Sequence, residues 1–164
     1  MNINEPVAVG WREWIALPDL AIESIKAKVD TGARTSALHA FDVRAFEKNG
    51  ELWVRFGVHP RQRDTKKEIW CESKVLDQRE VTDSGGHTEL RYVIETTASL
   101  GEKTWRIEMT LTNRDNMLFR MLLGRTALSA GNIVVNPTLS YLSGQTLTKH
   151  FQDSQQDDLE GETE

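Results

Sequence analysis

The stretch "AKVDTGARTSALHA", residues 27–40, places Asp30 directly after an alternating run that predicts a strand ending at Val29. Thr31 and Gly32 then turn the chain, and Gly32 allows backbone angles and close approaches that other residues do not. The simplest interpretation of Asp30 is the polar cap of an ordinary turn, because Asp and Gly both favour turns. The sharper interpretation is a catalytic carboxylate on the end of a strand, and a second motif favours it.

The second motif lies about ninety residues later, in "FRMLLGRTAL" (119–128). Leu122 and Leu123 run into Gly124-Arg125, and a short apolar helix follows. Gly131 stands at the natural end of that helix, so the sequence predicts a helix near 125–131.

The two motifs together resemble the retropepsin-like aspartic peptidases, whose single-lobe fold carries an early Asp-Thr/Ser-Gly-Ala, a central hairpin flap and a late hydrophobic-hydrophobic-Gly-Arg segment. The stretches "VDTGARTSALHA", "RYVIETTASLG", "IEMTLTNRDNMLFRMLLGRTAL" and "VNPTLSYL" are similar, more narrowly, to a bacterial family associated with RimK-type glutamate ligases. That family often bears the label "ATP-dependent zinc protease". The resemblance covers about residues 6–145.

The resemblance implies a role for each motif residue. The catalytic group is expected at Asp30, Thr31 and Gly32. Substrate contacts are expected from Ala33, Arg34 and the flap residues Ser84, Gly85 and Gly86. The segment expected to brace the fold beside the site is Leu123, Gly124 and Arg125. No metal and no cofactor is expected in the site.

An aspartic peptidase needs two carboxylates that share one proton around a water, and the pair titrates in two separated steps. This chain supplies one Asp-Thr-Gly. Asp83 in "TDSGG" is a candidate for the second, but no second hydrophobic-Gly-Arg segment accompanies it. We therefore assign Asp83 to the tip of the flap hairpin and expect a two-fold homodimer in which each chain contributes Asp30.

The chain departs from viral retropepsins at two positions. Thr126 stands where they usually have Asn or Asp, and Arg34 where they usually have Asp. The first departure is expected to weaken a polar contact that braces the fold. The second changes the charge beside the carboxylate and therefore bears on the class of substrate.

The family setting implies an acidic protein or peptide substrate, such as a glutamate-rich tail made by a RimK-type ligase. Arginines pair with carboxylates through two parallel hydrogen bonds, and five of them flank the motifs. These arginines are Arg34, Arg79, Arg91, Arg120 and Arg125. Two interpretations stay open: an acidic-substrate pocket, or solvated strand charges with Arg125 bracing the fold.

A different class of function is a non-catalytic module that keeps the fold and binds a peptide in the cleft. Such a module tolerates a monomer and Asp30→Asn, whereas a shared dyad requires a dimer and Asp30. The intact Asp-Thr-Gly-Ala favours the enzyme.

The elements that must position these residues are mainly strands. "FDVRAFEKNGELWVRFGV" (41–58) places Asn49-Gly50 between two alternating runs, which is a strong hairpin signal. Further runs, with a turn at 100–103, continue to residue 113, and "VAVGWREWIAL" (7–17) is read as one opening strand. The sequence predicts an all-β, retropepsin-like closed barrel of short strands with one short helix.

Composition sets the remaining limits. The net charge of −5 argues against nucleic acid as the main partner. Six of the acidic residues lie in "QDSQQDDLEGETE", so we expect one domain over 1–150 and a disordered acidic tail over 151–164. No run of apolar residues suits a membrane or signal segment, and we expect a cytoplasmic protein.

Zinc, ATP and thiol chemistry lack sequence support. The possible zinc ligands are single and scattered: His39, His59, His87, His150 and Cys71. A site assembled from distant residues is the one form of zinc site this pattern leaves open. There is no phosphate-binding Gly-x-x-x-x-Gly-Lys-Ser/Thr loop, and Cys71 in a strand is expected to be a small buried hydrophobe.

Overall fold

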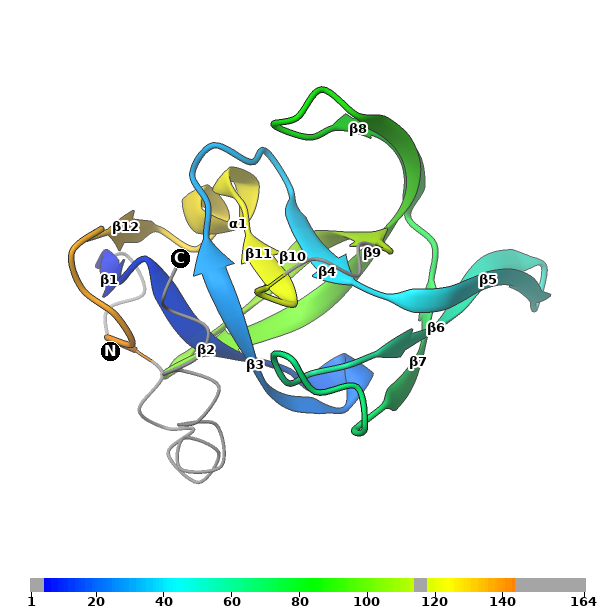
Figure 1. Cartoon of the computed structure of the whole chain (residues 1–164), viewed down its shortest axis with the longest axis horizontal. Coiled ribbons are helices and arrows are strands. Elements are labelled where there is room, and N and C mark those ends of the chain that lie inside the picture. The colour runs from blue at the N-terminus through cyan, green and yellow to red at the C-terminus, as the bar shows by residue number, and fades with distance from the viewer. Residues whose placement is uncertain (1–4, 114–117, 144–164) are drawn as a thin grey trace.

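The computed structural model describes residues 5–113 and 118–143, which form a β-rich structure with one short α-helix (Figure 1). The predicted domain end at 150 and the predicted tail over 151–164 lie outside the described residues. The elements are β1 (Val7–Val9), β2 (Arg12–Leu17), a 3-10 turn (Pro18–Leu20), β3 (Ile22–Val29), β4 (Ser36–His39), β5 (Phe41–Lys48), β6 (Glu51–Val58), β7 (Ile69–Lys74), β8 (Asp77–Thr82), β9 (Thr88–Leu100), β10 (Lys103–Thr112), β11 (Met121–Leu123), α1 (Arg125–Ala130) and β12 (Ile133–Val135).

Six strands close into a barrel in the order β10-β4-β11-β3-β2-β9, and β9 pairs again with β10. Because the ring is closed, it has no edge strand with a row of unpaired backbone N–H and C=O groups. The ring is mixed, because β11 runs parallel to β3 and β4 runs parallel to β10. The prediction of an all-β closed barrel is therefore confirmed.

Strand β9 belongs to two different structures along its length. Its second half, from Val93 to Leu100, pairs with β10 inside the ring. Its first half, from Thr88 to Val93, pairs with β8, which lies outside the ring and has no other partner strand among the described residues. In Figure 1 this β8–β9 hairpin arches beyond the barrel.

The predicted hairpins form where the sequence supplies residues that tolerate positive φ. Asn49 has φ 54° and Gly50 has φ 78°, as the tight turn between β5 and β6 requires. Gly101 has φ 60° in the turn between β9 and β10. Strands β5, β6 and β7 form a separate three-stranded sheet that projects from the barrel in Figure 1.

Residues 7–17 do not form the single strand that their alternation predicted. They divide at Gly10 into β1, which pairs in parallel with β12, and β2, which belongs to the barrel. A Cβ atom on Gly10 would lie 2.1 Å from the carbonyl oxygen of Leu139, so a distant segment occupies the space beside the break. Buried Glu13 accepts the Gly10 N–H at 2.7 Å and the Leu142 N–H at 2.8 Å.

The one α-helix begins after Gly124 and ends before Gly131, as its sequence predicts. It lies beside β11 and carries buried Ala127 and Leu128 toward the barrel. Within the ranges 5–113 and 118–143, no helix has the length and apolar character needed to cross a membrane.

The barrel interior is filled by aliphatic side chains and methionines, and each fully buried one contributes about 1.5–3 kcal/mol. The fully buried members include Ile15, Leu17, Ile22, Ile25, Leu38, Ile94, Leu100, Met109, Met121 and Leu123. Cys71 is also buried, and burial raises the pKa of its thiol to about 12. It therefore behaves as the small hydrophobe that the sequence predicted.

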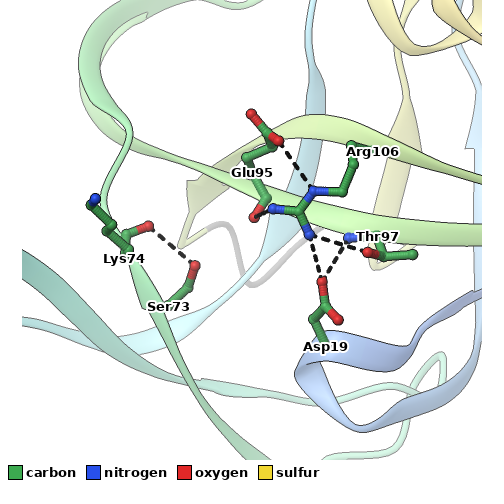
Figure 2. A network of polar contacts seen from close by, with 6 residues as sticks. All are labelled: Asp19, Ser73, Lys74, Glu95, Thr97 and Arg106. Atoms are coloured by element: carbon green, nitrogen blue, oxygen red, sulfur yellow. Dashed lines mark hydrogen bonds and ion pairs between the residues drawn. The ribbon is translucent and has the colours of Figure 1, made fainter.

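A polar network ties the 3-10 turn to strands β9 and β10 on the outside of the barrel (Figure 2). Arg106 donates to Asp19 at 2.7 Å and to the Glu95 carboxylate at 3.1 Å. The Thr97 N–H also donates to Asp19, at 3.1 Å. Hydrogen bonding by Thr97, together with the Arg106 charge, lowers the pKa of Asp19.

Candidate active site

Asp30 directly follows Val29, the last residue of the barrel strand β3. Its N–H donates to the carbonyl oxygen of Leu123 at 2.9 Å, which continues the pairing of β3 with β11. Its carboxylate Oδ1 accepts the N–H groups of Gly32 at 3.0 Å and Ala33 at 3.2 Å. The other oxygen, Oδ2, accepts no hydrogen bond from the residues described. Oδ1 is thus held by N–H groups of its own loop, whereas Oδ2 has no hydrogen-bond partner among the described residues.

The loop that follows Asp30 is held by the start of α1. The Arg125 N–H donates to the Ala33 carbonyl at 2.8 Å, and the Thr126 N–H donates to the Arg34 carbonyl at 2.9 Å. The Arg125 guanidinium also donates to the Thr31 carbonyl at 3.0 Å. The first helical N–H groups, which have no partner inside a helix, are therefore used to fix the loop.

Gly124 lets the two segments approach this closely. A Cβ atom on it would lie 2.6 Å from the carbonyl carbon of Thr35 and 2.8 Å from the Ser36 nitrogen. Its own N–H donates to the Ser36 hydroxyl at 2.9 Å. The structure therefore brings the Asp-Thr-Gly loop and the Leu-Leu-Gly-Arg segment into direct contact.

The hairpin between β8 and β9 carries Ser84, Gly85 and Gly86 at its tip, where the sequence predicted a flap. Asp83 caps this turn: its Oδ1 accepts the Gly85 N–H at 2.9 Å and the His87 N–H at 3.0 Å. These contacts match the assignment of Asp83 to the hairpin rather than to a second Asp-Thr-Gly-type loop.

A cleft of about 600 Å³ separates the Asp30 loop from this hairpin, and its volume is typical of a ligand site. The predicted residues that line it are Asp30, Gly32, Ala33, Arg34 and Ser84. The predicted residues that do not line it are Thr31, Gly85, Gly86, Leu123, Gly124 and Arg125. The last three instead support the Asp30 loop from behind through the contacts given above.

The five arginines divide into different environments. Arg34, Arg79 and Arg91 line the cleft, but Arg79 is paired with Asp77 at 2.8 Å and with Glu108 at 2.6 Å. These two carboxylates raise the pKa of Arg79. Arg34 is exposed, and its side chain pairs with nothing in the ranges 5–113 and 118–143. The idea of one common arginine pocket is therefore too broad, since buried Arg120 and exposed Arg125 lie outside the lining.

Sequence reasoning missed several residues of the cleft wall, because strands far apart in the chain supply them. Thr110 and Thr112 of β10 and Val81 of β8 line the cleft. Glu89, which bonds Thr112 at 2.6 Å, was missed as well. The available signal was spacing: Glu89 and Arg91 are two residues apart on β9, as Thr110 and Thr112 are on β10, so each pair shares a sheet face.

The residues described offer no fit for zinc. They contain no group of three His, Cys, Asp or Glu side chains that could hold a metal ion. His59 lies 3.7 Å from Glu68, and His87 lies 3.9 Å from Asp83, each as a single pair. Cys71, with its raised pKa, is buried away from the cleft.

The chain was compared with protein-family models and with known proteins, and both comparisons found matches over most of its length. The family model described as "Retropepsin-like aspartic endopeptidase RimB" matches residues 8–146. A protein named "Probable alpha-L-glutamate ligase" from Shewanella halifaxensis is 49% identical over 137 residues, which are 84% of this chain and 30% of that protein. A protein of the same name from Parasynechococcus marenigrum is 47% identical over 158 residues, 96% of this chain and 32% of that protein. The chain therefore spans about a third of the length of these relatives.

The fold also matches a solved structure. A protein of unknown function from Legionella pneumophila superposes with a TM-score of 0.72 and is 29% identical. The match covers 85% of this chain and 99% of the Legionella chain. The matched part of this chain thus corresponds to nearly the whole of that solved chain.

Proposed function

Since the chain belongs to the RimB-like family of retropepsin-like aspartic endopeptidases, we propose that it is an aspartic-type peptidase in which Asp30 activates a water. The observation that carries this proposal is the state of the Asp30 carboxylate. Two N–H groups hold Oδ1, while Oδ2 is uncommitted at a cleft that the β8–β9 hairpin faces. A carboxylate held through one oxygen is oriented for proton transfer, and its second oxygen remains available to a water.

The chemistry requires a second carboxylate within reach of the same water. In this proposal the second Asp30 comes from another copy of the chain, so one ionised carboxylate takes a proton from the water while the protonated partner donates to the substrate carbonyl. The exposed tip of the loop supports a close neighbour there. Thr31 and Gly32 are exposed, and the Thr31 hydroxyl has no partner in the part of the chain that the structure describes.

The proposed substrate is a protein or peptide rich in glutamate, and the proposed functional partner is a RimK-type glutamate ligase. Two observations support this. The relatives named as probable glutamate ligases contain a matching region in about a third of their length. The unpaired Arg34 lies in the same cleft as Asp30 and supplies a cation without a competing internal carboxylate.

The experiment that tests this function follows dimerisation and cleavage on the same samples. Sedimentation of the wild-type chain across concentration is combined with cleavage of glutamate-rich peptides, beside Asp30→Asn. We expect cleavage that rises with the dimer and disappears in Asp30→Asn. A monomer that binds these peptides without cutting them, unchanged by Asp30→Asn, would instead establish the non-catalytic binding module.

A further inference from the structure

Arg91 is the most deeply buried charged group of the cleft wall, with 7% of its surface exposed. Its Nε donates to the Glu89 carboxylate, and its Nη1 makes a long contact of 3.4 Å to the Thr110 hydroxyl. Thr110 in turn donates to the Ser36 carbonyl at 3.2 Å. The guanidinium is therefore fixed in position from strands β9 and β10.

The outer end of this guanidinium is not used. Its Nη2 makes no hydrogen bond within the described residues, yet it is not among their fully enclosed, unpaired polar atoms. Arg91 lines the cleft and keeps a small exposed part. An arginine that binds a carboxylate in full does so with two parallel donors, but Arg91 contacts Glu89 through Nε alone.

Arg79 lies directly opposite Arg91 in the β8–β9 ladder and lines the same cleft, but its state is different. Its Nε and Nη1 are paired with two separate carboxylates, Asp77 and Glu108. The two arginines therefore differ: Arg79 pairs with two carboxylates, whereas Arg91 pairs with one and has no hydrogen bond from Nη2 within the described residues.

We propose that the Nη1/Nη2 end of Arg91 is a carboxylate subsite, which takes an acidic side chain of the bound peptide. The proposal rests on the proposed peptidase function of the same cleft. In it, Arg91 determines specificity and Glu89 positions it: Glu89 holds Nε, aims the guanidinium at the cleft and leaves its outer donors for the ligand. Because Glu89 is negative, it also weakens the attraction for a second carboxylate.

A glutamine side chain of the same size cannot replace glutamate at this subsite. It offers one neutral acceptor where the ionised carboxylate offers two charged oxygens. Hydrogen bonds to charged groups contribute more than neutral ones, so we expect about tenfold to a hundredfold preference for glutamate at this position.

The test measures binding separately from cleavage. The full chain carrying Asp30→Asn is titrated with a fluorescent glutamate-rich peptide and with its glutamine counterpart of equal length. Adding Arg91→Lys should weaken binding of the glutamate peptide at least about tenfold and leave the glutamine peptide nearly unchanged, because lysine keeps the charge but loses the fork. Arg79→Lys, the matched control, should leave both affinities within about twofold.

A second variant gives an effect of opposite sign, which a structural role alone would not produce. Glu89→Gln keeps an oxygen that accepts from Arg91 and Thr112 but removes the competing charge. We expect the glutamate peptide to bind severalfold more tightly and the glutamine peptide to bind as before. Equal losses for both peptides in Arg91→Lys, or no gain in Glu89→Gln, would overturn the subsite.

The peptides also separate the two sources of a carboxylate. Each is made with a free and with an amidated C-terminus, and the side-chain subsite predicts the same affinity for both forms. Loss of binding on amidation would assign Arg91 to a terminal carboxylate and contradict the proposal. Failure of cleavage by the wild-type chain, with intact glutamate selectivity in binding, would count against the peptidase function and leave the subsite standing.

Discussion

At the scale of single residues, what the cleft can bind depends on which of its charged groups already have partners. Asp30 is held through Oδ1 alone, Arg79 is paired twice, and Arg34 has no partner among the residues described. A group with satisfied hydrogen bonds gains little from a ligand, whereas an unsatisfied one gains more. The residue type alone therefore does not identify a binding arginine, because its neighbours determine what remains for the substrate.

Arg34→Ala tests the cation nearest the catalytic loop. We expect this change to reduce kcat/KM for glutamate-rich peptides about threefold to tenfold, since an exposed arginine contributes modestly through solvent-screened charge. Neutral peptides should be cleaved at nearly the wild-type rate. Cleavage assays with both peptide classes at low and high salt check this, and equal losses on both would remove Arg34 from substrate selection.

The sequence predicted features that depend on local chemistry. The turn at Asn49-Gly50 could be read from residue type, because few residues permit its backbone conformation. The bracing segment with Gly124 was expected from the family resemblance, and the structure places it against the loop after Asp30. The break at Gly10 could not be read in this way, because the segment packed against it, at the carbonyl of Leu139, lies far away in the chain. Arg91 was already one of the five candidate arginines, but its contact with Thr110 and the bond from Thr112 to Glu89 could not be predicted, since they form only where β9 meets β10.

At the scale of elements, polar contacts fasten the short connections to the barrel wall. The Asp19 carboxylate joins the 3-10 turn to Thr97 of β9 and Arg106 of β10, as Figure 2 shows. The side chains of Asp19 and Arg106 are about half exposed, so water and salt screen this pair. The network therefore adjusts stability rather than determining the fold.

Asp19→Asn should lower the free energy of unfolding at pH 7 by less than about 1 kcal/mol. Because folding lowers the pKa of Asp19, its contribution is fully present above the unfolded-state pKa of about 4 and is lost as the pH falls through the lower folded-state pKa. Urea unfolding followed by tryptophan fluorescence should therefore show the difference from wild type at pH 7 and a smaller one near pH 2. The same difference at both pH values would mean that charge is not its cause.

At the scale of the whole molecule, the sequence contains one Asp-Thr-Gly, and the cleft described above lies between its loop and the β8–β9 hairpin. In the proposed shared dyad the active unit would be a symmetric pair, in which each copy presents the same surface to the other. Activity would depend on protein concentration, and an inactive chain would inactivate the active chain with which it dimerises.

Mixing chains tests this arrangement. With wild type held well above the concentration at which it dimerises, an equal amount of Asp30→Asn chain should reduce cleavage to about half, and a fourfold excess to about one fifth, because random pairing depletes intact dyads. Additional wild-type chain should raise the rate instead. A rate that stays constant across the Asp30→Asn titration would show that each chain acts alone.

Because the two halves of β9 pair with different strands, movement of the β8–β9 hairpin and opening of the barrel are separate events. From Val93 onward the strand is locked into the closed ring, while before Val93 its backbone pairs with β8 alone among the described strands. Side-chain hydrogen bonds of Glu89, Arg91 and Arg79 also join this hairpin to β10. Lifting the hairpin away from the cleft would thus leave every ladder of the ring intact. An extended chain could therefore be admitted or released by breaking only the side-chain contacts between this hairpin and β10, with the backbone pairing around the core unchanged.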